Sequence, residues 1–162
     1  MMWSKIRVMV RANLCEALKD RLDFHVAVYR ESHDSKYGRA WITLDGQQVG
    51  SWSCFEQLFH KVAVEQLRAR FPNGWTALEY DRFVAEQGVY SQKEFKGLLE
   101  EYLGLDPHAA LASAVPLTRL LAMCDKRIGQ RTLARIAIEN EPDLIVKMLY
   151  YIRMQYSNPA VE

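Results

Sequence analysis

A two-residue turn between two runs of strand character lies within residues 40–53, and few folds accommodate such a segment. Ala40 to Leu44 is rich in strand-forming residues, and Asp45-Gly46 follows it directly. Asp-Gly suits a type I′ turn, whose central residues have positive φ, so the chain reverses and its strands pair. We therefore expect residues 47–53 to run antiparallel to residues 40–44, with Gly50 marking a bulge.

The segments on both sides of this hairpin show two different periods. Apolar residues recur every four positions across residues 4–21, which predicts an amphipathic helix. Apolar positions alternate from Phe24 onward, which predicts a first strand. Ser53 and Glu56 have the spacing of a capping box, so we expect the next helix to begin there and to end before Pro72.

Residues 73–162 carry only helix signals. The expected helix starts are a residue near Thr76, a capping box at Ser91 and Glu94, and three prolines at first helical positions, Pro107, Pro116 and Pro142. Another helix is expected over residues 132–138. The order predicts an α+β fold with an N-terminal α-β-β-β-α unit (1–72), built on a three-stranded antiparallel sheet. An all-helical C-terminal portion (73–162) packs on this unit, and the short connections predict one domain, 1–162.

Composition excludes several classes of protein. The 162 residues are enough to bury a core without disulfides, and the net charge of +1 disfavours a strongly basic nucleic-acid binder. Residues 71–115 hold 3 basic and 7 acidic side chains, between two mildly basic ends. The three cysteines and four histidines lack metal-ligand spacing and no cofactor-binding glycine motif is present, so we expect no metal and no cofactor.

The N-terminus and the apolar segments bear on localisation. The N-terminal residues lack the apolar core of a signal peptide, and the longest uncharged run, residues 107–118, is too short to cross a bilayer. We therefore expect a cytoplasmic protein that does not enter a membrane.

The order helix, three strands, helix is also that of double-stranded-RNA-binding domains. Contact with phosphates there would need several lysines at the start of the second helix. This chain has Glu56 and a single lysine, Lys61, in that segment. RNA binding by this surface is therefore disfavoured, and we interpret the sheet as half of the core.

Residues 29–42 concentrate polar and basic side chains around the connection between two strands. His33 and Asp34 are candidate catalytic residues, because a carboxylate orients an imidazole for acid/base chemistry. Arg30 and Arg39, near the strand ends, are candidates for clamping an anion. A solvated hairpin loop is the favoured alternative, because adjacent side chains in an extended segment point in opposite directions.

Residues 119–135 form a basic helix junction broken by Gly129. Its candidates for binding an anion or nucleic acid are Lys126, Arg127 and Arg131, with Arg119 and Arg135 nearby, and its candidate catalytic residue is Asp125. The favoured alternative is a helix C-terminus at which cationic side chains interact favourably with the helix dipole and Asp125 pairs with an arginine.

These two segments also carry a resemblance. Tyr29-Arg30, Ser32-His33-Asp34, Gly38-Arg39 and Trp41-Ile42, followed by the run from Leu120 to Leu133, resemble a family of uncharacterised bacterial proteins over most of the chain. The resemblance implies a bacterial cytoplasmic setting and brings no activity or site residues with it.

Three functions remain open. The leading hypothesis is a non-catalytic interaction or regulatory module with a protein partner or self-association, since enzyme motifs of strong specificity are missing. The second is binding of nucleic acid or another anion through the basic residues named above. The third is an enzyme whose site joins the 30–39 loop to the 125–131 junction.

Overall fold

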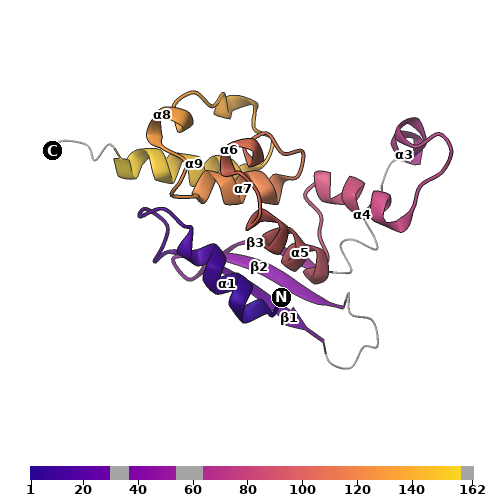
Figure 1. Cartoon of the computed structure of the whole chain (residues 1–162), viewed down its shortest axis with the longest axis horizontal. Helices are drawn as coiled ribbons and strands as arrows, with labels where there is room; N and C mark the ends of the chain where they lie inside the picture. The colour runs from indigo at the N-terminus through magenta and orange to yellow at the C-terminus, as the bar shows by residue number, and fades with distance from the viewer. Residues whose placement is uncertain (30–36, 54–63, 158–162) are drawn as a thin grey trace.

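The computed structural model describes residues 1–29, 37–53 and 64–157. Its elements follow one another as α1 (Trp3–Ala12), β1 (Leu22–Val28), β2 (Gly38–Leu44), β3 (Gln47–Ser53), α3 (Val64–Arg70), α4 (Ala77–Glu86), α5 (Gln92–Tyr102), α6 (Pro107–Ala110), α7 (Pro116–Cys124), α8 (Gln130–Leu133), the 3₁₀ turn η1 (Ile138–Asn140) and α9 (Leu144–Ser157). The expected α+β class, an antiparallel sheet after a first helix and helices thereafter, is confirmed (Figure 1).

The sheet has the order β1-β2-β3, with both pairs antiparallel. Asp45 and Gly46 have φ of 52° and 77°, the left-handed values that a type I′ turn requires. The register shifts between Ile42 and Thr43, because Ile42 lies opposite Gly50 and Thr43 opposite Gln48. The bulge expected at Gly50 is therefore present beside it.

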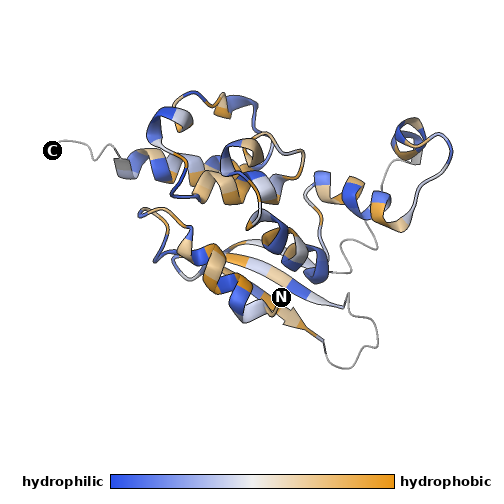
Figure 2. Ribbon diagram, in the orientation of Figure 1, coloured by the Kyte–Doolittle hydropathy of each residue, from blue (hydrophilic) through white to orange (hydrophobic). Residues whose placement is uncertain are grey.

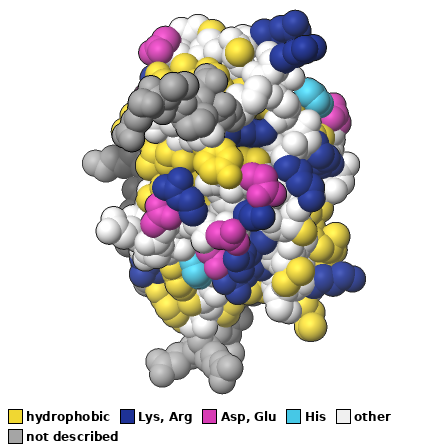
Figure 3. All heavy atoms as spheres, turned by 90° about the vertical axis from the view of Figure 1, so that its left-hand side faces the viewer, with side chains coloured by type: hydrophobic (Ala, Val, Ile, Leu, Met, Phe, Trp, Pro, Cys, Tyr) yellow, Lys and Arg dark blue, Asp and Glu magenta, His cyan; other side chains and the backbone are white. Residues whose placement is uncertain are grey.

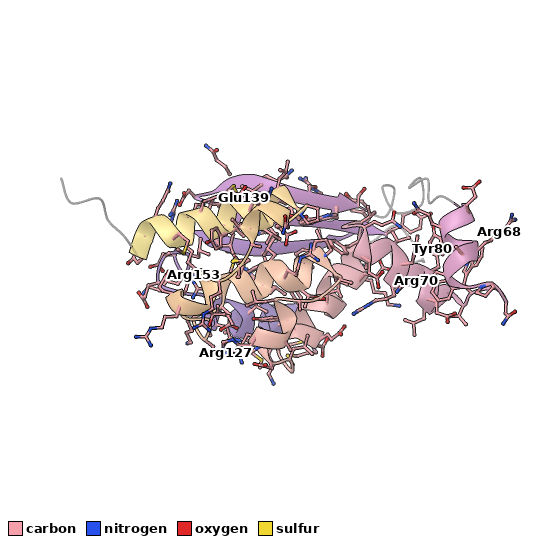
Figure 4. The ribbon with its side chains drawn as sticks, turned by 90° about the horizontal axis from the view of Figure 1, so that it is seen from above. Arg68, Arg70, Tyr80, Arg127, Glu139 and Arg153 are labelled. Atoms are coloured by element: carbon pink, nitrogen blue, oxygen red, sulfur yellow. The ribbon has the colours of Figure 1, made fainter. Side chains whose placement is uncertain are left out.

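One face of the sheet forms part of the core. Phe24, Ala40 and Ile42 alternate along their strands and are fully buried. Helices α1 and α5 contact each other and β1, and α5 also contacts β2, so both cover this face. In Figure 4 the sheet forms one layer, with α1 and α7 on the same side of it.

The first helix is shorter than its periodicity predicts. It ends at Ala12 rather than near residue 21, although Leu14 and Leu18 remain buried. The reason is a long-range contact: the Cys15 N–H donates to the Cys124 carbonyl at 2.8 Å instead of to a carbonyl one helical turn before it. The apolar period therefore continues through turns that are not helical.

Among the described helices, α5 lies with α1 over the sheet. We expected a helix from Ser53 to cover the sheet, but residues 54–63 lie outside the described residues, and so does the capping box at Glu56. The next described helix, α3, lies away from the sheet beyond α4 (Figure 1).

The later helices begin at the expected signals. Ser91 and Glu94 form a full capping box for α5, Thr76 and Glu79 form another for α4, and Asp106 caps α6. Helix α9 begins at Leu144 rather than at Pro142, because the Asp143 carboxylate accepts hydrogen bonds from two backbone amides of its first turn.

The helix expected over residues 132–138 is replaced by α8 and a 3₁₀ turn. The amide of Arg135 bonds to Thr132 and that of Ile136 to Leu133, the shorter spacing of 3₁₀ turns. Helix α7 is the central helix and contacts α5, α6 and α9. Figure 2 shows its largely apolar ribbon, and all its residues except Arg119 are buried.

Among the helices in the described ranges, none combines the length and the apolarity that crossing a bilayer requires.

Candidate functional site

Asp125 lies at the end of α7 in a buried hydrogen-bonded cluster. Its side chain is fully buried and accepts the Tyr102 hydroxyl at 2.7 Å and the Arg127 guanidinium at 2.7 Å and 3.0 Å. Burial raises the pKa of Asp125, but hydrogen bonds from Arg127 and Tyr102 outweigh it, so this pKa lies below its usual value. The pKa of Tyr102 is raised by burial and by the adjacent carboxylate. Asp125 is thus an ionised acceptor inside the protein.

The junction also fastens the end of α1 to the end of α7. Leu14 and Asp125 form an antiparallel bridge, and the Lys126 N–H donates to the Asn13 carbonyl at 2.8 Å. The Lys126 ammonium donates to the Ala12 carbonyl at 2.7 Å, where it caps α1.

A buried arginine from α9 adds two contacts near this connection between the ends of α1 and α7, which we call the seam. Arg153 donates to the Met123 carbonyl at 2.6 Å and also to the Ile128 carbonyl. Figure 4 shows Arg153 and Arg127 at the same end of the molecule, opposite to Arg68 and Arg70. Sequence reasoning missed Arg153, because a lone arginine in an apolar helical stripe gives no indication of its partner.

The basic residues of the junction therefore differ in their roles. Arg127 and Lys126 bind the protein itself, and Arg119 pairs with Glu141 at 2.8 Å. Arg131 and Arg135 are exposed, and α8 is a single turn of four residues. On the end of the molecule shown in Figure 3, Lys and Arg side chains are interspersed with Asp, Glu and apolar ones.

Arg39 lies on the outer face of the sheet, in a stack around Trp41. The His25 ring stacks on Trp41 with centroids 5.0 Å apart, and the Arg39 guanidinium lies 5.1 Å from the Trp41 centroid. Arg39 also donates to Ser51 and Gln48 of β3, whereas His25 belongs to β1. The Trp41 ring therefore already contacts an aromatic ring and a guanidinium, which makes it a poor platform for a nucleic-acid base.

Arg30, His33 and Asp34 lie outside the described residues. The predicted meeting of the 30–39 loop with the 125–131 junction therefore stays a prediction. Within residues 1–29, 37–53 and 64–157, no three His, Cys, Asp or Glu side chains are grouped so that they could share a metal ion.

A surface groove of about 270 Å³ lies between α4 and α5, and we call it the α4–α5 groove. Its lining is apolar at Leu78, Ala85, Gly97 and Leu98 and charged at Asp81, Arg82, Glu94 and Glu101. Leu78 is 78 % exposed, although it is a large apolar residue. A second hollow of about 250 Å³ shares Arg82 and Glu101 and continues to Leu105 and Ala109.

Sequence reasoning did not find this groove. Phe83, Val84 and Ala85 are the buried residues of α4, whereas Leu78 is exposed. A large apolar residue in the acidic segment 71–115 is the sequence signal that could have indicated the groove.

A family model described as the SF0329 protein family matches residues 2–154. No curated protein and no solved structure matches the chain.

Proposed function

The chain belongs to the SF0329 protein family, and we propose that it is a protein-interaction module whose α4–α5 groove binds an amphipathic, basic helix of a partner protein. The observation that carries this proposal is an apolar groove between two helices, lined by three carboxylates and one arginine. It supports the leading hypothesis from the sequence, that of an interaction module.

The shape of the groove favours side chains of a helix over a small molecule. Its volume of about 270 Å³ is slightly below the range of about 300–1,000 Å³ that is typical of small-molecule sites. A groove with an apolar floor between two helices suits a third helix, which places residues i, i+3, i+4 and i+7 into the groove. The adjoining hollow beyond Arg82 and Glu101 extends the surface along such a ligand.

The negative charge around the groove favours a partner with positively charged side chains. Arg82 lies 3.7 Å from Glu101, so the only cation of the lining is paired with one of its three acids. Asp81 and Glu94 add negative charge, and the segment 71–115 as a whole is acidic. A helix with Lys or Arg beside its apolar stripe complements this field, and the complementarity accelerates association at low salt.

Gly97 permits a direct test. A Cβ at Gly97 meets nothing within 4 Å, so a larger side chain enters the groove without displacing the core. We expect Gly97→Phe to weaken binding of a fluorescent designed peptide, with Leu at groove-facing positions and Lys elsewhere, by at least about tenfold, or about 1.4 kcal/mol. The measurement is fluorescence polarisation with the full chain at two salt concentrations.

Two controls make the result specific. Gln155→Phe adds the same ring to an exposed position of α9 and should leave peptide binding unchanged. A peptide with Glu in place of Lys should bind at least about tenfold more weakly than the Lys peptide. Equal binding by Gly97→Phe and the unchanged chain, or equal binding of both peptides, would contradict the proposal.

A second copy of this chain is the competing occupant of the α4–α5 groove. Helix α1 presents Val8, which is 67 % exposed, and Met9 beside Lys5. A dimer of the full chain that Gly97→Phe dissociates in analytical ultracentrifugation would assign the groove to a second copy and overturn the proposal of a different partner.

A further inference from the structure

Cys15 and Cys124 are neighbouring residues at the contact between the segment after α1 and the end of α7. Leu14 pairs with Asp125 in an isolated antiparallel bridge, and the two cysteines lie next to that pair in the sequence. The Cys15 N–H donates to the Cys124 carbonyl at 2.8 Å. This bond holds the backbones of the two cysteines side by side. A disulfide joins residues whose Cα atoms lie about 4.4–6.8 Å apart, so it needs this kind of proximity.

The two thiols differ in access. Both are buried and reduced, with Cys124 fully enclosed and Cys15 lining a hollow of about 130 Å³ that also contacts Gln130 and Arg153. Burial raises the pKa of Cys15, but the charge of Arg153 and the amides of Ala17 and Leu18 oppose this rise. Burial also raises the pKa of Cys124, and the nearby Cys15 adds to the effect. Cys15 is therefore the thiol that a small reagent reaches first.

We propose that Cys15 and Cys124 are a modification site, a dithiol that hydrogen peroxide oxidises to an intramolecular disulfide. The Cys15 thiolate attacks one peroxide oxygen, the O–O bond breaks, and the leaving hydroxide takes a proton and departs as water. Cys15 is then a sulfenic acid. The Cys124 sulfur attacks the Cys15 sulfur, the S–S bond forms, and the sulfenic oxygen leaves as a second water with the Cys124 proton. One peroxide is reduced and two thiols are oxidised.

The disulfide would add a covalent link across this contact. It would join the chain after α1 to the end of α7, a connection that otherwise depends on the bridge and on Lys126. Closing so long a loop restricts the unfolded chain, so oxidation should raise the melting temperature, and a thiol reductant should reverse the rise.

The experiment uses the full chain with Cys54→Ser, because only Cys15 and Cys124 then remain. After treatment with hydrogen peroxide in native buffer, we expect denatured protein to lose both titratable thiols. Intact mass should fall by two hydrogen atoms, and dithiothreitol should restore both values. Peptide mapping of the unchanged chain should find the same Cys15–Cys124 linkage, which keeps the test valid if the variant folds poorly.

Variants that keep only one of the two thiols separate the roles of Cys15 and Cys124. In Cys54→Ser/Cys124→Ser, dimedone should trap a sulfenic acid at Cys15, whereas in Cys54→Ser/Cys15→Ser the thiol of Cys124 should stay reduced. Thiols that persist in the folded chain at peroxide doses that oxidise the unfolded chain would overturn the proposal. Oxygen adducts without an S–S linkage would overturn it as well.

Discussion

Asp125 shows how one side chain fixes the meeting of two distant segments. It is an ionised carboxylate without exposed surface, and Tyr102 and Arg127 both donate to it. The Arg127 side chain is 42 % exposed, so water screens part of the ion pair, and the buried Tyr102 hydroxyl depends on Asp125 more strongly.

Asp125→Asn should destabilise the protein by about 1–3 kcal/mol at neutral pH, because it removes the charge that both donors face. The folded-state pKa of Asp125 lies below its unfolded value, so its contribution is complete above about pH 4 and is lost as pH falls through the folded pKa. Urea denaturation of both proteins across pH should therefore show a difference that shrinks in acid. A difference that grows in acid, or none at neutral pH, would count against this role.

At the scale of elements, two glycines show where helix α5 is close-packed and where it is open. A Cβ at Gly38 of β2 would lie 2.3 Å from the Ala27 carbonyl oxygen of β1 and 2.6 Å from Cγ of Gln92, the first residue of α5. A Cβ at Gly97, in the middle of α5, would meet no atom within 4 Å. The same substitution should therefore have opposite effects at the two positions.

Gly38→Ala should destabilise the chain by about 1–3 kcal/mol, because backbone atoms of the neighbouring strand must move. Gly97→Ala should stabilise it by about 0.5–1 kcal/mol, because alanine loses less entropy than glycine in a helix. The free energy of unfolding in urea measures both changes. Changes of the same sign in the free energy of unfolding at both positions would contradict the packing described for α5.

At the scale of the whole molecule, the two halves of the chain share one core. The buried face of β1 and β2 is covered by α5, and the end of α1 is bridged to the end of α7. We therefore infer that residues 1–72 and residues 73–162 depend on each other to bury their apolar surfaces.

We therefore expect fragment 1–72 to lack cooperative unfolding, while the full chain unfolds in a single transition followed by circular dichroism and by Trp fluorescence. Mixing the two fragments should restore part of the folded signal. A cooperative transition for fragment 1–72 by itself would show that the sheet has a sufficient core without α5.

The sequence by itself determined the features that depend on a few neighbouring residues. Asp45-Gly46 placed the hairpin, Ser91 with Glu94 and Asp106 placed two helix starts, and alternation placed the first strand. These signals are local because a turn or a cap is decided by dihedral angles and hydrogen bonds within four residues.

The tertiary structure alone decided what depends on residues far apart. The bond from Cys15 to Cys124 ended α1, contact with the sheet selected α5, and the spacing of α4 and α5 opened a groove beside Leu78. The arginine partner of Asp125 was foreseen as an alternative, but its tyrosine partner, 23 positions away, was not. Apolar periodicity gives the face that a helix buries but not the element that it meets, because hydrophobic burial is non-directional.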